Sequence, residues 1–135
     1  MRSQILIAAI VGTAATACTQ VGPTGPTPRE MAELARELNG RIAGPPQRCI
    51  DGFRTTGRSQ VIGPNILYEE GRTLWVNHTS GGCESAGRAG YILVTEQRGT
   101  SEYCRGDIVK VVTTNGGMFA GSCGFGDFVP YRKPR

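Results

Sequence analysis

The sequence predicts a mostly β protein, a small bent β-barrel or roll with one N-terminal α-helix, stabilised by two disulfides. Three observations support this fold class. From Arg48 onward, short β-rich runs alternate with turn residues. One amphipathic segment with a marked helix start precedes them. Four of the five cysteines fall within the β-rich part, where an even number can form the bridges that a small core needs.

The β-rich runs are short and are separated by turn residues such as glycine, proline and asparagine. We expect strands over residues 49–55, 59–62, 66–68, 73–77, 91–95, 108–114, 118–123 and 128–131. Asn115 and Gly116 suit a tight type I′ turn between the two runs that flank them. Leu74 and Val76 share one face of their strand, so at least one strand is expected to be half-buried. The strand order is left open.

Residues 28–42 are expected to form one amphipathic helix. Thr27 can cap it, Pro28 suits its first position, and Glu30 can reach back to the backbone N–H of the cap. Asn39-Gly40 is a stop signal. A helix this short is unstable alone, so its apolar face should dock on its own domain or on a partner, and we favour its own domain. That face carries Met31, Leu34, Ala35, Leu38 and Ile42.

The first seventeen residues have the form of a secretory signal peptide. A short basic head precedes an apolar run from Ile5 to Ala17, which is too short to cross a hydrocarbon core of about 30 Å. The four residues that end at Cys18 resemble the lipobox of bacterial lipoproteins, in which the cysteine is acylated and becomes the new N-terminus. Ordinary signal peptidase cleavage is the alternative and would leave a free thiol at Cys18. We favour lipidation, because an unpaired exposed thiol is a liability in an oxidising compartment.

The residues after Cys18 bear on localisation. Residues 18–27 are rich in glycine and proline and are expected to form a flexible tether. Thr19 stands where an aspartate commonly retains lipoproteins in the inner membrane, so the resemblance implies the outer membrane, with the domain facing the periplasm. A secreted or soluble periplasmic protein is the alternative. The expected partner is therefore the membrane, through the lipid on Cys18.

Charge argues against a nucleic-acid partner. The chain has a formal net charge of +4, and removal of Arg2 with the signal peptide leaves 14 basic and 11 acidic residues, a net charge of +3. The basic residues are dispersed, apart from Arg132, Lys133 and Arg135 at the end of the chain. A dispersed charge of this size on an exported protein excludes nucleic acid from the expected partners.

The four cysteines of the β-rich part are expected to form two structural disulfides. They are Cys49, Cys83, Cys104 and Cys123, and no Cys-x-x-Cys spacing points to zinc or thiol exchange. Three pairings are possible, and sequence alone does not choose among them. We favour Cys83 with Cys104 and Cys49 with Cys123, because this nests one loop inside the other and ties the first strand to the last.

Two cysteine motifs carry a resemblance. Cys-x-Gly-Asp-Ile at 104–108 and Cys-Gly-x-Gly-x-Phe-x-Pro at 123–130 are similar to a domain-of-unknown-function family of small secreted proteins and lipoproteins of proteobacteria. The resemblance covers about residues 47–131, departs at 51–54 and 80–82, and implies a shared fold and export. It implies no activity, so it assigns no catalytic residue.

The sequence contains few residues in a pattern that points to catalysis or to metal binding. His78 is the only histidine and is expected to be a loop residue, with a hydrolase role as the lesser hypothesis. Glu69-Glu70 precedes a glycine and is expected to belong to a hairpin turn rather than to a catalytic carboxylate pair. Asp107 and Asp127 are placed for turn hydrogen bonds rather than for metal. We therefore assign no catalytic, metal or cofactor-binding residue.

These observations predict a non-enzymatic bacterial envelope lipoprotein, a tethered binding or structural module in the periplasm. An envelope protein is a further possible partner, and a small-molecule ligand is not identified. The alternative is an inhibitor or accessory subunit of a periplasmic enzyme, and a hydrolase is third.

Overall fold

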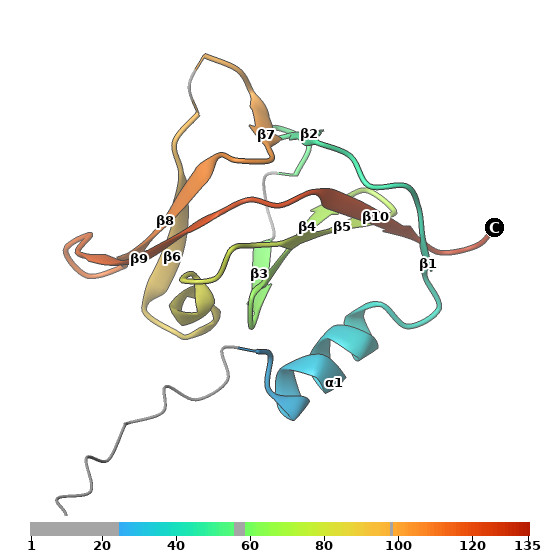
Figure 1. Cartoon of the computed structure of the whole chain (residues 1–135), viewed down its shortest axis with the longest axis horizontal. Coiled ribbons are helices and arrows are strands. Elements are labelled where there is room, and N and C mark those ends of the chain that lie inside the picture. Colours follow the sequence, from blue (N-terminus) through green and yellow to red (C-terminus); the bar gives the residue numbers. More distant parts are fainter. Residues whose placement is uncertain (1–24, 56–58, 98) are drawn as a thin grey trace, which may run out of the picture.

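The structure is a computed structural model that describes residues 25–55, 59–97 and 99–135 (Figure 1). The expected signal peptide at 1–17, the lipidation at Cys18 and most of the tether lie outside the described residues. The elements follow in the order α1 (Pro28–Glu37), β1 (Ile42–Ala43), β2 (Cys49–Asp51), β3 (Ser59–Ile62), β4 (Asn65–Glu70), β5 (Thr73–His78), the 3₁₀ turn η1 (Glu84–Gly87), β6 (Tyr91–Thr95), β7 (Glu102–Cys104), β8 (Ile108–Thr113), β9 (Phe119–Gly124) and β10 (Phe128–Arg132).

The strands form three antiparallel sheets. The five-stranded sheet has the order β1-β10-β5-β4-β3, the three-stranded sheet has the order β6-β8-β9, and β2 pairs with β7. A mostly β fold with one α-helix and two disulfides is thus confirmed. In the part of the chain that the structure describes, the sheets are not closed into a barrel.

The helix begins as predicted and ends earlier than predicted. Thr27 Oγ1 accepts from the backbone N–H of Glu30 at 3.3 Å, and Glu30 Oε2 accepts from the N–H of Thr27 at 2.7 Å, which completes the capping box. The last helical residue is Glu37, and Gly40 turns the chain with a φ of 71°. The expected extension to Ile42 is therefore wrong, because Ile42 lies in β1 opposite Arg132.

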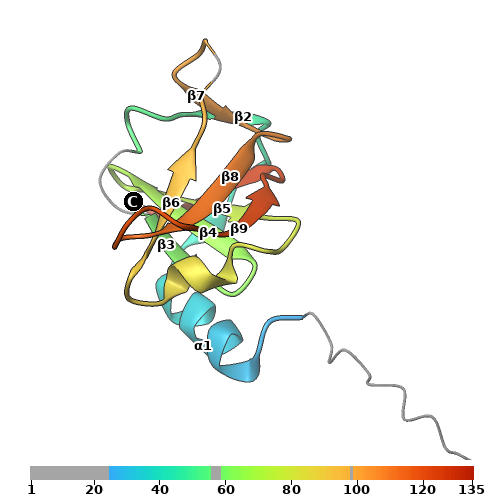
Figure 2. The same ribbon diagram turned by 90° about the vertical axis from the view of Figure 1, so that its left-hand side faces the viewer.

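The helix docks on its own domain. Figure 2 shows α1 beneath the strands, and Leu34 and Leu38 of this helix pack against a cluster on one face of the five-stranded sheet. The buried members of this cluster are Ile62, Leu67, Leu74 and Val76. Both faces of the sheet are consequently covered, and β4 and β5 are buried on both sides rather than half-buried.

The main core lies between the five-stranded and three-stranded sheets. Tyr68, Phe125 and Phe128 are in mutual ring contact, with ring centroids 5.2 to 6.3 Å apart. Around these rings lie Ile50, Ile66, Trp75, Cys83, Val109, Val111 and Cys123, all buried. Aromatic contacts of this kind add to the stabilisation that area burial provides.

The disulfide pairing that we favoured is wrong. The bridges are Cys49–Cys104 and Cys83–Cys123. Cys49 and Cys104 are directly opposite each other in the β2–β7 ladder, so that pairing depends on β7, a strand that we did not predict. Cys123 lies in β9 and points into the main core, where the loop after β5 brings Cys83.

Two local predictions also need correction. The run at 49–55 ends as a strand at Asp51, because the Asp51 carboxylate accepts from the N–H groups of Phe53 and Arg54 and turns the chain. The β8–β9 hairpin exists, but the type I′ turn at Asn115-Gly116 does not. Positive φ values fall on Gly116 and Gly117, at 86° and 64°, and on no described residue other than glycine.

Candidate functional site

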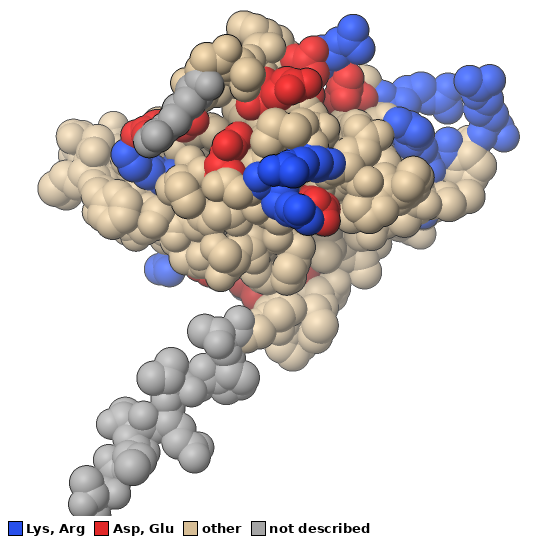
Figure 3. All heavy atoms as spheres, turned by 45° about the horizontal axis from the view of Figure 1, so that its top comes forward, with Lys and Arg blue, Asp and Glu red and all other residues tan. Residues whose placement is uncertain are grey.

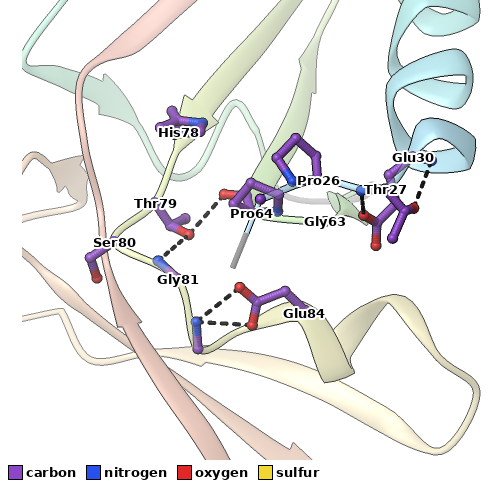
Figure 4. Close-up of a pocket in the computed structure, with 12 residues that line it drawn as sticks. Pro26, Thr27, Glu30, Gly63, Pro64, His78, Thr79, Ser80, Gly81 and Glu84 are labelled. Atoms are coloured by element: carbon purple, nitrogen blue, oxygen red, sulfur yellow. Dashed lines mark hydrogen bonds between the residues drawn. The ribbon is translucent and has the colours of Figure 1, made fainter. Parts of the chain in front are cut away.

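An open groove of about 770 Å³ lies at one end of the described part of the molecule. It lies between the start of α1, the β3–β4 turn and the loop that follows β5 (Figure 4). We call it the His78 groove. Its lining residues are Gly25, Pro26, Thr27, Glu30, Gly63, Pro64, His78, Thr79, Ser80, Gly81, Gly82 and Glu84.

The backbone that forms the groove needs glycine at two positions. Gly63 has a φ of 55°, a conformation that favours glycine, and a Cβ there would lie 3.0 Å from the Glu30 Oε2 of the helix cap. A Cβ on Gly82, with a φ of 102°, would lie 2.3 Å from the carbonyl oxygen of Ser122 in β9. The groove therefore depends on a positive φ at both glycines and on a close backbone approach at Gly82.

His78 is exposed at the end of β5, and its ring is oriented by Asn65. The ring Nδ1 lies 2.9 Å from Asn65 Oδ1, while the Asn65 amide nitrogen faces the Ile62 carbonyl at 3.4 Å. A neutral His78 thus carries its proton on Nδ1 and presents Nε2 as an acceptor. Nε2 has no partner among the described residues, so this atom is the chemically available group of the groove.

The hydroxyl groups of the groove are held by backbone atoms rather than by His78. Thr79 Oγ1 donates to the Pro64 carbonyl at 2.8 Å and accepts from the Gly81 N–H at 3.2 Å. Ser80 Oγ accepts from the N–H of Gly124 at 2.8 Å. A nucleophile for acyl transfer needs a hydrogen bond to its base. The hydrogen bonds of both hydroxyls to backbone groups instead give them a structural role.

The two carboxylates of the groove are also used by the fold. Glu30 completes the helix cap, and Glu84 accepts from the Gly82 N–H through both oxygens, at 2.9 and 3.1 Å. Figure 4 shows both carboxylates turned toward the backbone that they bind. The lining is fixed before any ligand arrives, an arrangement that lowers the entropic cost of binding.

Asn77 is the residue whose importance the sequence analysis missed. Its side chain is fully buried, and it donates to the Gly126 carbonyl at 2.8 Å and accepts from the Gly126 N–H at 3.0 Å. These bonds join β5 to the segment between β9 and β10. A polar residue in an otherwise apolar strand was the available signal. The hydrogen-bond partner of the Asn77 side chain is visible only in the folded structure.

The acidic residues that we singled out have structural partners. Glu70 Oε2 accepts from the indole N–H of Trp75 at 2.8 Å, and Gly71 turns the chain with a φ of 56°, so this pair belongs to a hairpin. Asp107 Oδ2 accepts from the N–H of Cys104 at 2.8 Å, which is the expected turn hydrogen bond. Asp127 lies 3.4 Å from the Arg105 guanidinium.

One described cluster contains residue types that bind metals, but its two cysteines are not free to act as ligands. Cys49, Glu102 and Cys104 bring their ligand atoms within 4.8 Å of one another. Both sulfurs belong to a disulfide, and a cysteine binds a metal only as a thiolate. The cluster is therefore a disulfide with a neighbouring carboxylate.

Within residues 25–55, 59–97 and 99–135, no helix combines the length and apolarity that a membrane crossing requires. Comparisons with family models, with curated proteins and with solved structures find no match to this chain. The resemblance to small secreted proteins and lipoproteins consequently rests on the two cysteine motifs alone.

Proposed function

We propose that this protein is an exported, lipid-anchored binding module of the bacterial envelope, with the His78 groove as its binding site. The observation that carries the binding role is the preformed groove, whose hydroxyls and carboxylates are bonded to the backbone while His78 Nε2 has no hydrogen-bond partner among the described residues. Such a site can recognise a ligand by hydrogen bonding but has no activated nucleophile among the described residues.

Export is supported by the two disulfides and by the signal-like N-terminus. Disulfides persist in oxidising compartments and are rare in reducing ones. In this proposal the lipid on Cys18 and the segment 19–27 hold the domain at the outer membrane, in agreement with the family that the motifs at 104–108 and 123–130 resemble.

The intact mass of the protein isolated from the bacterial envelope tests anchoring and disulfides together. We expect a chain that begins at Cys18, carries acyl groups there and has lost four hydrogens to two disulfides. An unprocessed chain with reduced cysteines would refute export. A chain cut before Cys18 but free of acyl mass would refute the anchor and leave export standing.

Capture from detergent-solubilised envelope tests the binding role. We expect the wild-type domain and the control variant Glu37→Gln, at the far end of α1, to recover the same partner, and His78→Ala to lose it. Equal recovery by all three would refute the groove as the binding site. Recovery of one stoichiometric enzyme whose activity falls on binding would identify the inhibitor or accessory subunit instead.

A further inference from the structure

The exposed apolar side chains gather on one sheet. Eight large hydrophobic residues are exposed in the part of the chain that the structure describes, and five of them belong to the three-stranded sheet and its β8–β9 loop. They are Ile92, Val94, Ile108, Met118 and Phe119, and Met118 and Phe119 are 66% and 67% exposed. A soluble surface normally scatters such residues, so this grouping points to a contact.

The strand register places four of these side chains, those of Ile92, Val94, Ile108 and Phe119, on the outer face of the sheet. Ile92 pairs with Val112, and Val112 pairs with Phe119, so the three form one row across β6, β8 and β9. Val109 and Val111, which alternate with that row along β8, point the other way and are fully buried in the main core. We call Ile92, Val112 and Phe119 the hairpin patch.

The hairpin end of the three-stranded sheet has no charged side chain, and a charged side chain first occurs one row further along the sheet, at Lys110. Residues 112–121 contain no charged side chain. Lys110 is on the same outer face, two residues or about 7 Å from Val112 along β8, and is ion-paired with Glu96. Figure 3 shows a mostly uncharged surface at the end of the molecule where the hairpin lies, while basic residues gather at the opposite, C-terminal end.

The described chain begins beside this sheet. Gly25 lines the same groove as Gly82, and Gly82 packs against the carbonyl of Ser122 in β9. Only residues 19–24 separate Gly25 from Cys18, and the seven steps along the chain from Cys18 to Gly25 reach at most about 25 Å. A lipid on Cys18 therefore keeps the three-stranded sheet close to the bilayer that holds it.

From these observations we propose that the hairpin patch rests on the lipid surface, with its apolar side chains at the boundary of headgroups and acyl chains. An interfacial segment enters this boundary by about 5 to 10 Å, which is the distance from the patch to Lys110. The Lys110 ammonium then lies at the level of the lipid phosphates, where its aliphatic stem remains in apolar surroundings. This inference rests on the proposed function, because the lipid on Cys18 supplies the proximity.

Tryptophan placed in the patch can report the contact. The chain has a single tryptophan, Trp75, which is 5% exposed and gives a constant background. The test variant is Phe119→Trp, and the matched control is Phe53→Trp, which is 72% exposed in the turn after β2. Both acylated variants are reconstituted in vesicles of phosphatidylethanolamine and phosphatidylglycerol that carry bromine on the acyl chains.

We expect bromine to lower the emission of the Phe119→Trp variant about twofold and to shift it to the blue, because contact quenching reaches an indole at the acyl boundary. The emission of the Phe53→Trp variant should not change. Intact mass confirms the acyl group on each sample, so the anchor is checked separately from the contact.

Three results would overturn the inference. Equal quenching of both acylated variants would refute it and leave the anchored module standing. A blue shift of the Phe119→Trp variant that grows with protein concentration, without quenching, would assign the patch to a second copy of the chain. A mature protein without acyl mass would refute the anchor and this inference with it.

Discussion

The two disulfides should differ in how much they stabilise the fold, although they close loops of similar length. The sequence separations are 55 residues for Cys49–Cys104 and 40 residues for Cys83–Cys123. Loop-closure entropy alone gives about 4.2 and about 3.9 kcal/mol at 25 °C. On this basis, replacing either pair by alanine would lower the free energy of unfolding by about 4 kcal/mol.

Packing separates the two bridges. Cys83 and Cys123 are 2% and 3% exposed within the main core, whereas Cys49 and Cys104 are half-buried at the two-stranded sheet. Removing two buried sulfurs leaves unfilled space that costs about 1 kcal/mol for each atom. We therefore expect a loss of about 6 kcal/mol for Cys83→Ala with Cys123→Ala, against about 4 kcal/mol for the other pair.

Urea denaturation followed by Trp75 fluorescence and far-ultraviolet circular dichroism measures both losses. A domain of this size has a net stability of about 5 to 15 kcal/mol, so the buried-pair variant should be close to unfolded while the half-buried-pair variant keeps a cooperative transition. The two double variants control for each other, because each removes one bridge of nearly equal loop length. An equal or larger loss for Cys49→Ala with Cys104→Ala would refute the packing argument.

Three further predictions concern single residues. Burial, together with Tyr103, raises the pKa of the Tyr68 phenol in the folded state. The phenol of the unfolded chain therefore ionises first above about pH 10, and the free energy of unfolding falls as the pH rises. Urea titrations at pH 8 and pH 11 should show a smaller fall for Tyr68→Phe than for the wild type. Asn77→Leu should lower the free energy of unfolding, measured by urea titration, by about 2 to 4 kcal/mol, because it leaves buried backbone groups unpaired. A loss below about 1 kcal/mol would contradict the role of the Asn77 amide. Gly82→Ala should lower the melting temperature far more than Gly116→Ala. Both glycines have a positive φ, but only at Gly82 would the added Cβ lie 2.3 Å from a backbone oxygen. Similar shifts in melting temperature for the two variants would count against the close approach at Gly82.

The fold class followed from local patterns that the structure retains. The runs at 59–62 and 91–95 agree with β3 and β6, because β-branched and apolar residues there are bounded by turn residues. The helix start was predictable because the capping box lies within four residues. In each case the stabilising contacts lie close together in the sequence.

The errors arose where distant segments decide local structure. β7 is a strand only because Glu102–Cys104 pairs with β2, about fifty residues earlier, and no apolar alternation marks it. The disulfide pairing follows from that ladder, so it could not be read before the strand was known. Ile42 has a side chain that suits the helix, but pairing with β10 decides its conformation.

The candidate site was predictable only in part. His78 stood out as the single histidine of the chain, yet its orientation depends on Asn65, which the β4–β5 ladder places directly opposite. The hairpin patch was hidden because Ile92 and Phe119 lie on one face only after β6 and β9 have both paired with β8. A strand pattern shows which residues alternate, but not which of the two faces stays uncovered.

The order of the bridged cysteines has a consequence for cleavage of the chain. The bridges interleave along the sequence and divide it into three intervals, 49–83, 83–104 and 104–123. One cut in any interval, or one cut in each of two intervals, leaves every piece covalently connected. With nested bridges, two such cuts could release the middle piece. With at most one cut in each interval, a protease must therefore cut all three intervals before the part of the chain between Cys49 and Cys123 separates into two.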